Sequence, residues 1–243
     1  MSNLQLHRGP TAGTFWLAAA AIFAFCFAVM AEAVAHGVEG KDASFIEGAS
    51  GIQVMPFIYL GAKHMITGYD HLLFILGVIF FMHRMVHVAI YVTLFSIGHS
   101  ITLLAGVLGE INVNPYLVDA IVGLSVAYKA FDNLGGFVRI IGFQPNLKAV
   151  VFSFGLVHGF GLATKLQELQ LSPDGLLVNM ISFNVGVELG QLAALSFMLV
   201  VMHFWRRSRL FEGQAIIANG VMLCAGFVLM QYQLLGFYLS RSI

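Results

Sequence analysis

The residues of this chain that could do chemistry are histidines and carboxylates placed inside otherwise apolar stretches. Four such stretches together contribute His64, Asp70, His71, His99, His158 and Glu188. Imidazole binds nickel, copper, zinc and iron, and carboxylates broaden that choice. A charged side chain at the centre of a membrane costs about 2.5–3.5 kcal/mol, so it needs a partner or a purpose. The set predicts a site for a divalent transition-metal ion.

The spacing of His64 and His71 leaves two arrangements open. They lie seven residues apart and therefore share a helical face. The rise between them on a straight helix is about 10 Å, which is too far for both to bind one ion. They are either successive stations for an ion, or Gly68 breaks the helix between them. Asp70 either binds the metal itself or fixes the tautomer of a neighbouring imidazole.

The other stretches surround their titratable residues with small or polar neighbours. Ser100 shares a helical face with His99, and glycines flank His158. Asn184, Glu188 and Gln191 follow the spacing i, i+4, i+7 and predict one polar stripe on a helix. Glu188 falls near the middle of its apolar stretch and is the strongest candidate. Ser100, Asn184 and Gln191 are supporting candidates. The alternative is structural: interfacial histidines, a capping aspartate, and a protonated carboxyl bonded to its neighbours.

Composition indicates a membrane protein. Of 243 residues 59% are hydrophobic and only 10% are charged, against about 25% charged in soluble domains. The apolar runs have the length of helices that cross a bilayer. The zero net charge gives no reason to expect nucleic acid. Cys26 and Cys224 lie in separate apolar runs, away from the histidines, and form no CxxC pair, so neither a disulfide nor a thiolate site is indicated. The predicted fold class is all-α: a polytopic transmembrane bundle of six core helices.

The chain divides into three predicted parts. Residues 1–35 read equally well as a signal peptide or as a first transmembrane helix. Residues 36–53 are glycine-rich and polar, which predicts an extracytoplasmic loop. Residues 54–243 form the six-helix transmembrane domain, in which an outer turn near 54–62 leads into the first helix. The expected helices are that first one, to about residue 81, and then 85–107, 115–133, 148–164, 175–203 and 214–238.

The basic residues predict the orientation. Arg206, Arg207 and Arg209 crowd one short connection, whereas the 108–114 connection contains no lysine or arginine. Because basic residues collect on the cytoplasmic side, this pattern places residues 206–209 inside and the C-terminus outside. The expected location is a bacterial inner membrane.

Four segments resemble the HupE/UreJ family of membrane proteins, in its second, more divergent branch. They are Gly68–Phe74, Gly98–Leu103, Gly155–Gly161 and Phe183–Gln191, and the likeness covers roughly residues 55–235. The resemblance implies permeation of nickel, sometimes cobalt, in support of hydrogenase and urease maturation. It implies metal binding by His64, Asp70, His71, His99, His158 and Glu188. Met65 departs from the better-studied branch, where proline follows the first histidine.

Three functions remain open. The first is a permease whose substrate is a divalent transition metal: nickel, or otherwise cobalt, copper or zinc. The second is an intramembrane zinc-dependent hydrolase built on His71, His99 and His158. The third is a non-transporting accessory subunit. We expect no enzyme, and the sequence has no phosphate-binding loop of the GxxxxGK[ST] type. Expected partners are the metal ion, the lipid bilayer, and either another membrane protein or a second copy of this chain.

Overall fold

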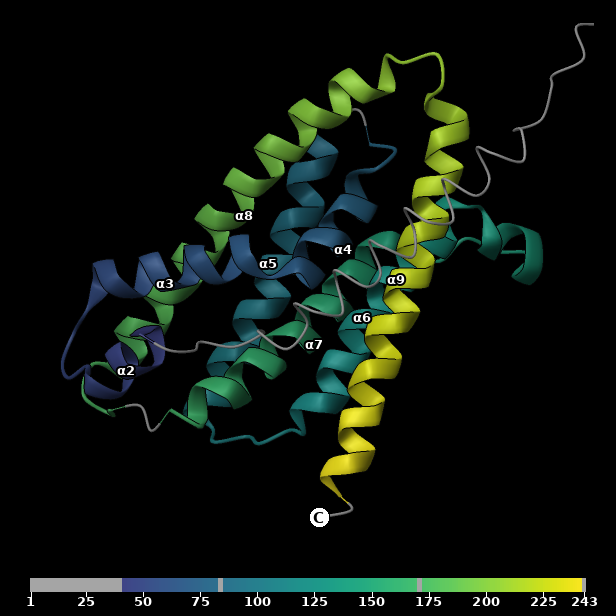
Figure 1. Cartoon of the computed structure of the whole chain (residues 1–243). Helices are drawn as coiled ribbons and strands as arrows, with labels where there is room; N and C mark the ends of the chain where they lie inside the picture. Colours follow the sequence, from purple (N-terminus) through teal and green to yellow (C-terminus); the bar gives the residue numbers. More distant parts are fainter. Residues whose placement is uncertain (1–40, 83–84, 170–171, 242–243) are drawn as a thin grey trace, which may run out of the picture.

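A computed structural model describes residues 41–82, 85–169 and 172–241. Within these ranges the regular structure is helical and includes no strand, which confirms the predicted all-α class. The helices are α2 (Lys41–Gly48), α3 (Val54–Thr67), α4 (Tyr69–Ile79), α5 (Met85–Leu108), α6 (Pro115–Asn133), η2 (Phe137–Ile141), α7 (Leu147–Gln167), α8 (Leu176–Arg206) and α9 (Phe211–Ser240) (Figure 1). The predicted signal peptide or first helix, residues 1–35, lies outside the described residues.

The predicted helices from residue 85 onward end within three residues of the observed ones. Two earlier segments differ from the prediction. The polar stretch predicted as a loop contains α2, which is held to the bundle by the buried side chain of Ile46. The outer turn expected near 54–62 is instead part of α3, and the chain bends later, at Gly68. Polar residues around a single buried apolar anchor hide such a short helix from a hydropathy reading.

The bend at Gly68 separates α3 from α4. Gly68 has an extended backbone (φ −77°, ψ 100°), and its N–H donates to the carbonyl of His64 at 3.0 Å. Its own carbonyl accepts from the N–H of Leu72 at 3.1 Å. The end of one helix and the start of the next are therefore both hydrogen-bonded, so the break leaves few backbone groups without partners.

Glycines hold the bundle together in helix pairs. The most extensive contacts join α5 to α7, α6 to α9 and α3 to α8. A Cβ on Gly155 would collide with the backbone of Phe95 in α5, and a Cβ on Gly186 would collide with the backbone of Ile58 in α3. The patterns Gly155-x-x-x-Gly159 and Gly186-x-x-x-Gly190 thus serve close helix packing, as predicted.

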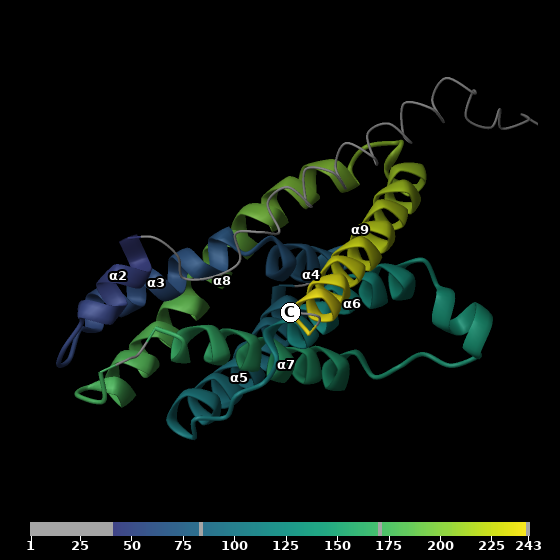
Figure 2. The same ribbon diagram turned by 60° about the horizontal axis from the view of Figure 1, so that its bottom comes forward.

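Helix α4 lies in the middle of these pairs. It contacts α6 and α8 as well as α3, α5 and α9 (Figures 1 and 2). The side chain of Arg206, at the end of α8, donates to the carbonyls of Ile79 (2.6 Å) and Phe80 (2.9 Å). These bonds satisfy the last carbonyls of α4, and they fix the short helix that carries part of the site.

Four of the described helices are long and apolar enough to cross a membrane: α5 from Val86, α7, α8 and α9. Two of the six predicted spans are not among these four. Helix α6 carries three charged residues, Asp119, Lys129 and Asp132, and the first span is divided at Gly68 into α3 and α4. The protein is an integral membrane protein. One end of the bundle carries Arg139, Lys148, Arg206, Arg207 and Arg209, and we call it the basic end. The opposite end carries the 109–114 connection, the C-terminal end of α7, the start of α8 and the C-terminal end of α9 (Figure 1).

Candidate metal centre

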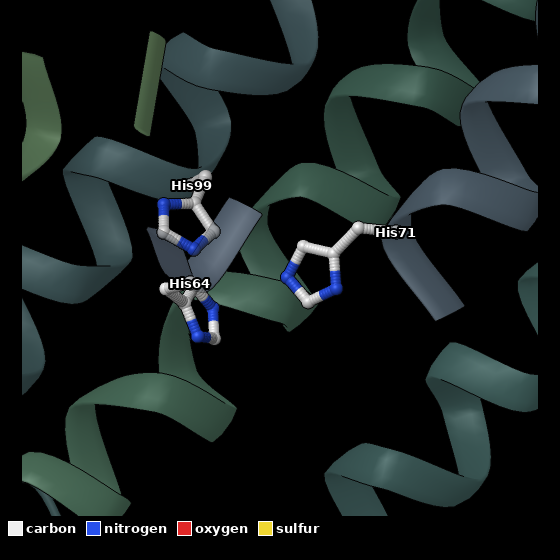
Figure 3. A group of neighbouring side chains, drawn as sticks. All are labelled: His64, His71 and His99. Atoms are coloured by element: carbon white, nitrogen blue, oxygen red, sulfur yellow. The ribbon is translucent and has the colours of Figure 1, made fainter. Parts of the chain in front are cut away.

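Three histidines from three different helices face one another. His64 lies in the last turn of α3, His71 in the first turn of α4 and His99 in the middle of α5. One ring nitrogen of each lies within 4.8 Å of those of the other two (Figure 3). The rings of His64 and His71 are 5.1 Å apart, edge to face. The break at Gly68 therefore removes the separation of about 10 Å that a straight helix would impose.

Asp70 orients the ring of His71. Its Oδ1 lies 2.5 Å from His71 Nδ1 and also accepts the backbone N–H of His71 at 2.8 Å. Both residues are buried, with exposed fractions of 9% for Asp70 and 7% for His71. Because a carboxylate can only accept, Nδ1 carries the proton, and Nε2 keeps its lone pair for a metal. Asp70 thus positions His71 as a ligand and adds negative charge beside it.

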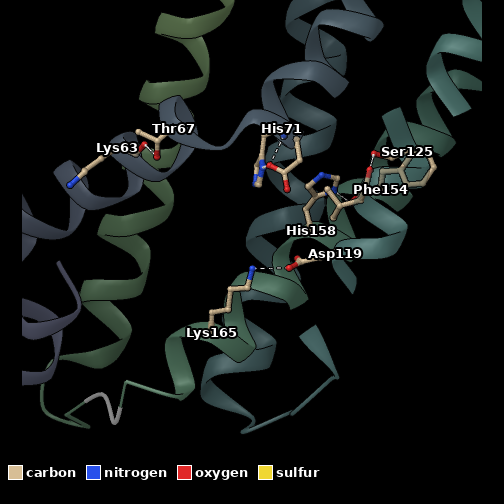
Figure 4. Close-up of polar contacts among 10 residues, drawn as sticks. Lys63, Thr67, His71, Asp119, Ser125, Phe154, His158 and Lys165 are labelled. Carbon is tan, nitrogen blue, oxygen red and sulfur yellow. Dashed lines mark hydrogen bonds and ion pairs between the residues drawn. The ribbon is translucent and has the colours of Figure 1, made fainter. Parts of the chain in front are cut away.

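His158 brings a fourth imidazole to the same place. Its Nδ1 donates to the carbonyl of Phe154 at 2.7 Å, so its Nε2 is again the nitrogen with the free lone pair. The ring centroid lies 4.9 Å from that of His71 (Figure 4). Helix α7 supplies this residue, so histidines from α3, α4, α5 and α7 converge.

Several of these ring nitrogens are buried without a hydrogen bond. Within the described residues no partner exists for Nε2 of His71, for Nε2 of His158, or for either ring nitrogen of His99. Leaving one buried polar group unpaired costs about 1–3 kcal/mol. Metal–imidazole bonds of about 2.0–2.1 Å hold two ligand nitrogens no more than about 4.2 Å apart. A small closing movement from the observed 4.8 Å gives that spacing, so the donor set fits a metal ion.

A cavity of about 50 Å³ lies beside the histidines. Its walls are His64, Thr67, Gly68, Asp70, His71, Asp119, Val122, His158, Gly161, Leu162 and Lys165. A Cβ on Gly68 would stand 3.0 Å from His71 Nδ1 and 3.3 Å from Asp70 Oδ1. The glycine thus keeps space open next to the ligands, and the cavity can hold an ion with a few waters.

Three phenylalanines close the centre on the side facing the basic end. Phe95 and Phe154 each lie one turn before a cluster histidine, on α5 and α7, and Phe74 lies one turn after His71 on α4. The ring of Phe74 is 5.7 Å from that of Phe95 and 5.6 Å from that of Phe154. Phe74 and Phe95 are each 1% exposed. This layer, the phenylalanine layer, separates the histidines from the basic end.

An ion pair lies on the other side of the histidines. Lys165 Nζ donates to Asp119 Oδ2 at 2.9 Å, and both side chains line the cavity (Figure 4). Asp119 lines the site although it was not among the residues predicted from the sequence. A carboxylate in an otherwise apolar helix was a signal, but the partner 46 residues later is brought to it only by the packing of α6 against α7.

The predicted polar stripe on α8 divides in the structure. Gln191 is fully buried and accepts from Ser96 at 2.6 Å, and Asn184 accepts from Ser100 at 3.0 Å. Glu188 is exposed on the outer surface of α8, among exposed apolar neighbours, and does not join the histidines. Residues at i and i+7 keep nearly the same direction on a helix, whereas i+4 turns about 40° away. Asn184 and Gln191 therefore tie α8 to α5, and Glu188 faces outward.

A family model described as HupE / UreJ protein matches residues 40–241 of this chain. This match covers every described helix, from α2 to α9. Searches of curated proteins and of solved structures find no match. The match spans the histidine cluster, the glycine-paired helices and the cavity together, so the chain belongs to the HupE/UreJ family.

Proposed function

We propose that this protein is a permease that carries a divalent transition-metal ion across the membrane, with nickel as its first substrate. The observation that carries the proposal is the convergence of His64, His71 and His99 from three helices onto one point. The family is generally associated with nickel and cobalt transport, which supports the choice of metal. Imidazole nitrogen is a ligand that suits nickel.

The proposed ligands are His64, His71 and His99, with His158 as the fourth. Asp70 acts through His71, whose tautomer it fixes, and its negative charge offsets part of the charge of the ion. Neutral imidazoles bind a divalent ion less tightly than thiolates would, and a permease must also release what it binds. A set of imidazoles with one nearby carboxylate suits capture followed by release.

The route runs along the bundle. The cavity lets the ion approach from the end that carries the 109–114 connection, and the phenylalanine layer blocks its onward path. Passage therefore requires Phe74, Phe95 and Phe154 to separate after the ion has bound. A site that is open on one side at a time is what alternating access requires.

The proposed orientation puts the basic end in the cytoplasm and the C-terminus outside. Five described arginines and lysines mark that end, and basic residues near helix ends collect on the cytoplasmic side. The ion would then enter from outside and leave inward, in a bacterial inner membrane.

Uptake into proteoliposomes tests the proposal. Vesicles that enclose a metal-sensitive dye are given Ni²⁺ outside, and the dye response is compared for the wild type, His71→Ala and Glu188→Gln. We expect His71→Ala to lose at least tenfold in rate, in the range that loss of ligand support costs. Glu188→Gln is the matched control, because it alters a carboxylate in a membrane helix away from the cluster, and it should transport normally.

Wild-type uptake no faster than that of protein-free vesicles would refute the permease, and equal uptake by all three proteins would remove His71 from its binding site. Absence of uptake by the wild type, with one tightly held zinc ion, would instead favour the intramembrane hydrolase. Absence of both uptake and bound metal would favour the accessory subunit, which another membrane protein or a second copy of this chain would then complete.

A further inference from the structure

The ion pair between Asp119 and Lys165 lines the cavity on the side away from the phenylalanine layer. It joins α6 to α7, and its side chains keep exposed fractions of 17% for Asp119 and 21% for Lys165. Lys165 follows His158 by seven residues on α7, and both residues line the cavity. Seven residues advance a helix by about 10 Å along one face. The pair therefore lies about two turns from the histidines, toward the end through which an ion would arrive.

Asp119 offers a carboxylate that can bind a metal ion, and the ammonium of Lys165 is already paired with that carboxylate. A carboxylate oxygen binds hydrated divalent cations readily, because it need not strip their water at once. The ammonium of Lys165 sits on a flexible chain of four methylenes and can leave without backbone movement. Beyond it in the same cavity is His158, whose Nε2 is buried and has no partner among the described residues.

We propose that Asp119 is a cation-binding station at the entrance of the cavity, and that the Lys165 ammonium occupies it until a divalent ion displaces it. The proposal rests on the permease function proposed above. An arriving ion replaces a monovalent charge with a divalent one on the same carboxylate. It then passes to the histidines, and Lys165 returns to Asp119 behind it. Asp119 attracts the ion, and Lys165 opposes every cation that does not compete for the carboxylate.

A purely structural ion pair would behave differently. If the pair only held α6 to α7, removing either charge would weaken the bundle, and both variants would change binding in the same direction. If Asp119 is a station with a tethered occupant, the two variants change the rate of entry in opposite directions. Removing the carboxylate slows entry, and removing the ammonium accelerates it. This difference in sign makes the proposal testable.

The experiment measures the association rate of radioactive Ni²⁺ with the full chain in detergent, by rapid mixing and filtration. We expect Lys165→Gln to bind roughly tenfold faster than the wild type and Asp119→Asn roughly tenfold slower, within the range of local charge effects on association. Lys165→Arg keeps a cation on Asp119 and should not show the acceleration of Lys165→Gln, since a guanidinium pairs with a carboxylate at least as firmly as an ammonium does. Lys148→Gln removes an exposed lysine at the other end of α7 and is the matched charge control, with no expected effect.

Two further measurements keep the result decisive. The double variant Asp119→Asn/Lys165→Gln leaves neither charge unpaired and should bind slowly, like Asp119→Asn, although its fold is not strained by a lone charge. Thermal unfolding of each variant identifies any loss of structure. Equal rates, or changes of the same sign in both single variants, would overturn the station while equilibrium nickel retention leaves the permease standing. Lack of nickel retention by the wild type would overturn both proposals.

Discussion

His99 buries both nitrogens of its ring without a hydrogen bond from the rest of the described chain. Its side chain is fully inaccessible, and it lies against His71 and Phe95. A buried polar ring without hydrogen bonds lowers the stability of the fold, so its presence at this position calls for a functional explanation. Binding of a metal ion supplies that reason, because the ion takes up the lone pair that the protein leaves unused.

Replacing His99 with leucine should separate stability from function. His99→Leu removes an unpaired polar group from the interior, so the metal-free protein should gain about 1–3 kcal/mol of stability. The same change should abolish metal binding. Thermal unfolding in detergent, with and without Ni²⁺, measures both effects. A lower unfolding temperature in the absence of metal would show that His99 makes a structural contribution after all.

Asp70 should set the affinity of the site through His71. Asp70→Asn keeps the shape of the side chain but removes the negative charge and offers an amide in place of one oxygen. His71 then loses the partner that fixes its tautomer. We expect nickel affinity to fall by about 10- to 100-fold, as is typical when a carboxylate that supports a metal-binding histidine is lost. Equilibrium dialysis measures this affinity. Affinity equal to that of the wild type would remove Asp70 from the site.

At the scale of the helices, the break at Gly68 and the close glycine contacts determine where the histidines lie. The sequence indicated the helices from residue 85 onward, because continuous apolar runs mark them. It left open whether His64 and His71 meet, since that depends on the backbone at Gly68. It also placed Glu188 with Asn184 and Gln191, because spacing alone does not say which edge of a polar stripe faces a neighbouring helix.

The contact of α5 with α7 should tolerate no side chain at Gly155. In Gly155→Ala the new methyl group would collide with the backbone of Phe95 and push apart the helices that carry His99 and His158. We expect the free energy of unfolding to fall by about 1–3 kcal/mol, as for other overpacked interiors. Nickel binding should also weaken. Gly220→Ala is the control, since a Cβ at Gly220 meets nothing within 4 Å. Similar unfolding temperatures for the two variants would contradict this role.

The phenylalanine layer should prevent leakage through the bundle. Phe74→Ala removes the ring that contacts both Phe95 and Phe154. We expect nickel to enter proteoliposomes faster, because the layer no longer closes the path from the histidines to the basic end. The equilibrium affinity for nickel should stay near that of the wild type. Phe197→Ala, an exposed residue on α8, is the control. Slower uptake in Phe74→Ala with normal folding would show that the ring assists passage.

At the scale of the whole molecule, the polarity of the bundle follows from its charges. The all-α class and the membrane location were predictable from composition, because so few charges cannot cover a soluble surface. The cavity and the pairing of Asp119 with Lys165 were not, since they join residues 46 positions apart. Contacts between distant segments arise from packing, which a single sequence does not display.

The proposed orientation predicts where reporters will be active. Alkaline phosphatase, which folds only outside the cytoplasm, should be active when fused after Arg241 and inactive when inserted at Ser208 in the connection between α8 and α9. The clustered arginines of that connection retain it inside. The reverse pattern of activity would invert the proposed direction of transport.

Whether the histidine cluster holds a metal ion is decided by the metal content of the purified protein after equilibration with nickel, cobalt, copper and zinc together. Elemental analysis would compare the wild type, His99→Leu and Glu188→Gln, followed by exchange against an isotope of the retained metal. We expect about one ion per chain that exchanges freely, is lost in His99→Leu and is kept in Glu188→Gln, as for a single site of imidazole ligands. Equal metal content in all three proteins would contradict this expectation, because the ion would then bind somewhere other than the histidine cluster.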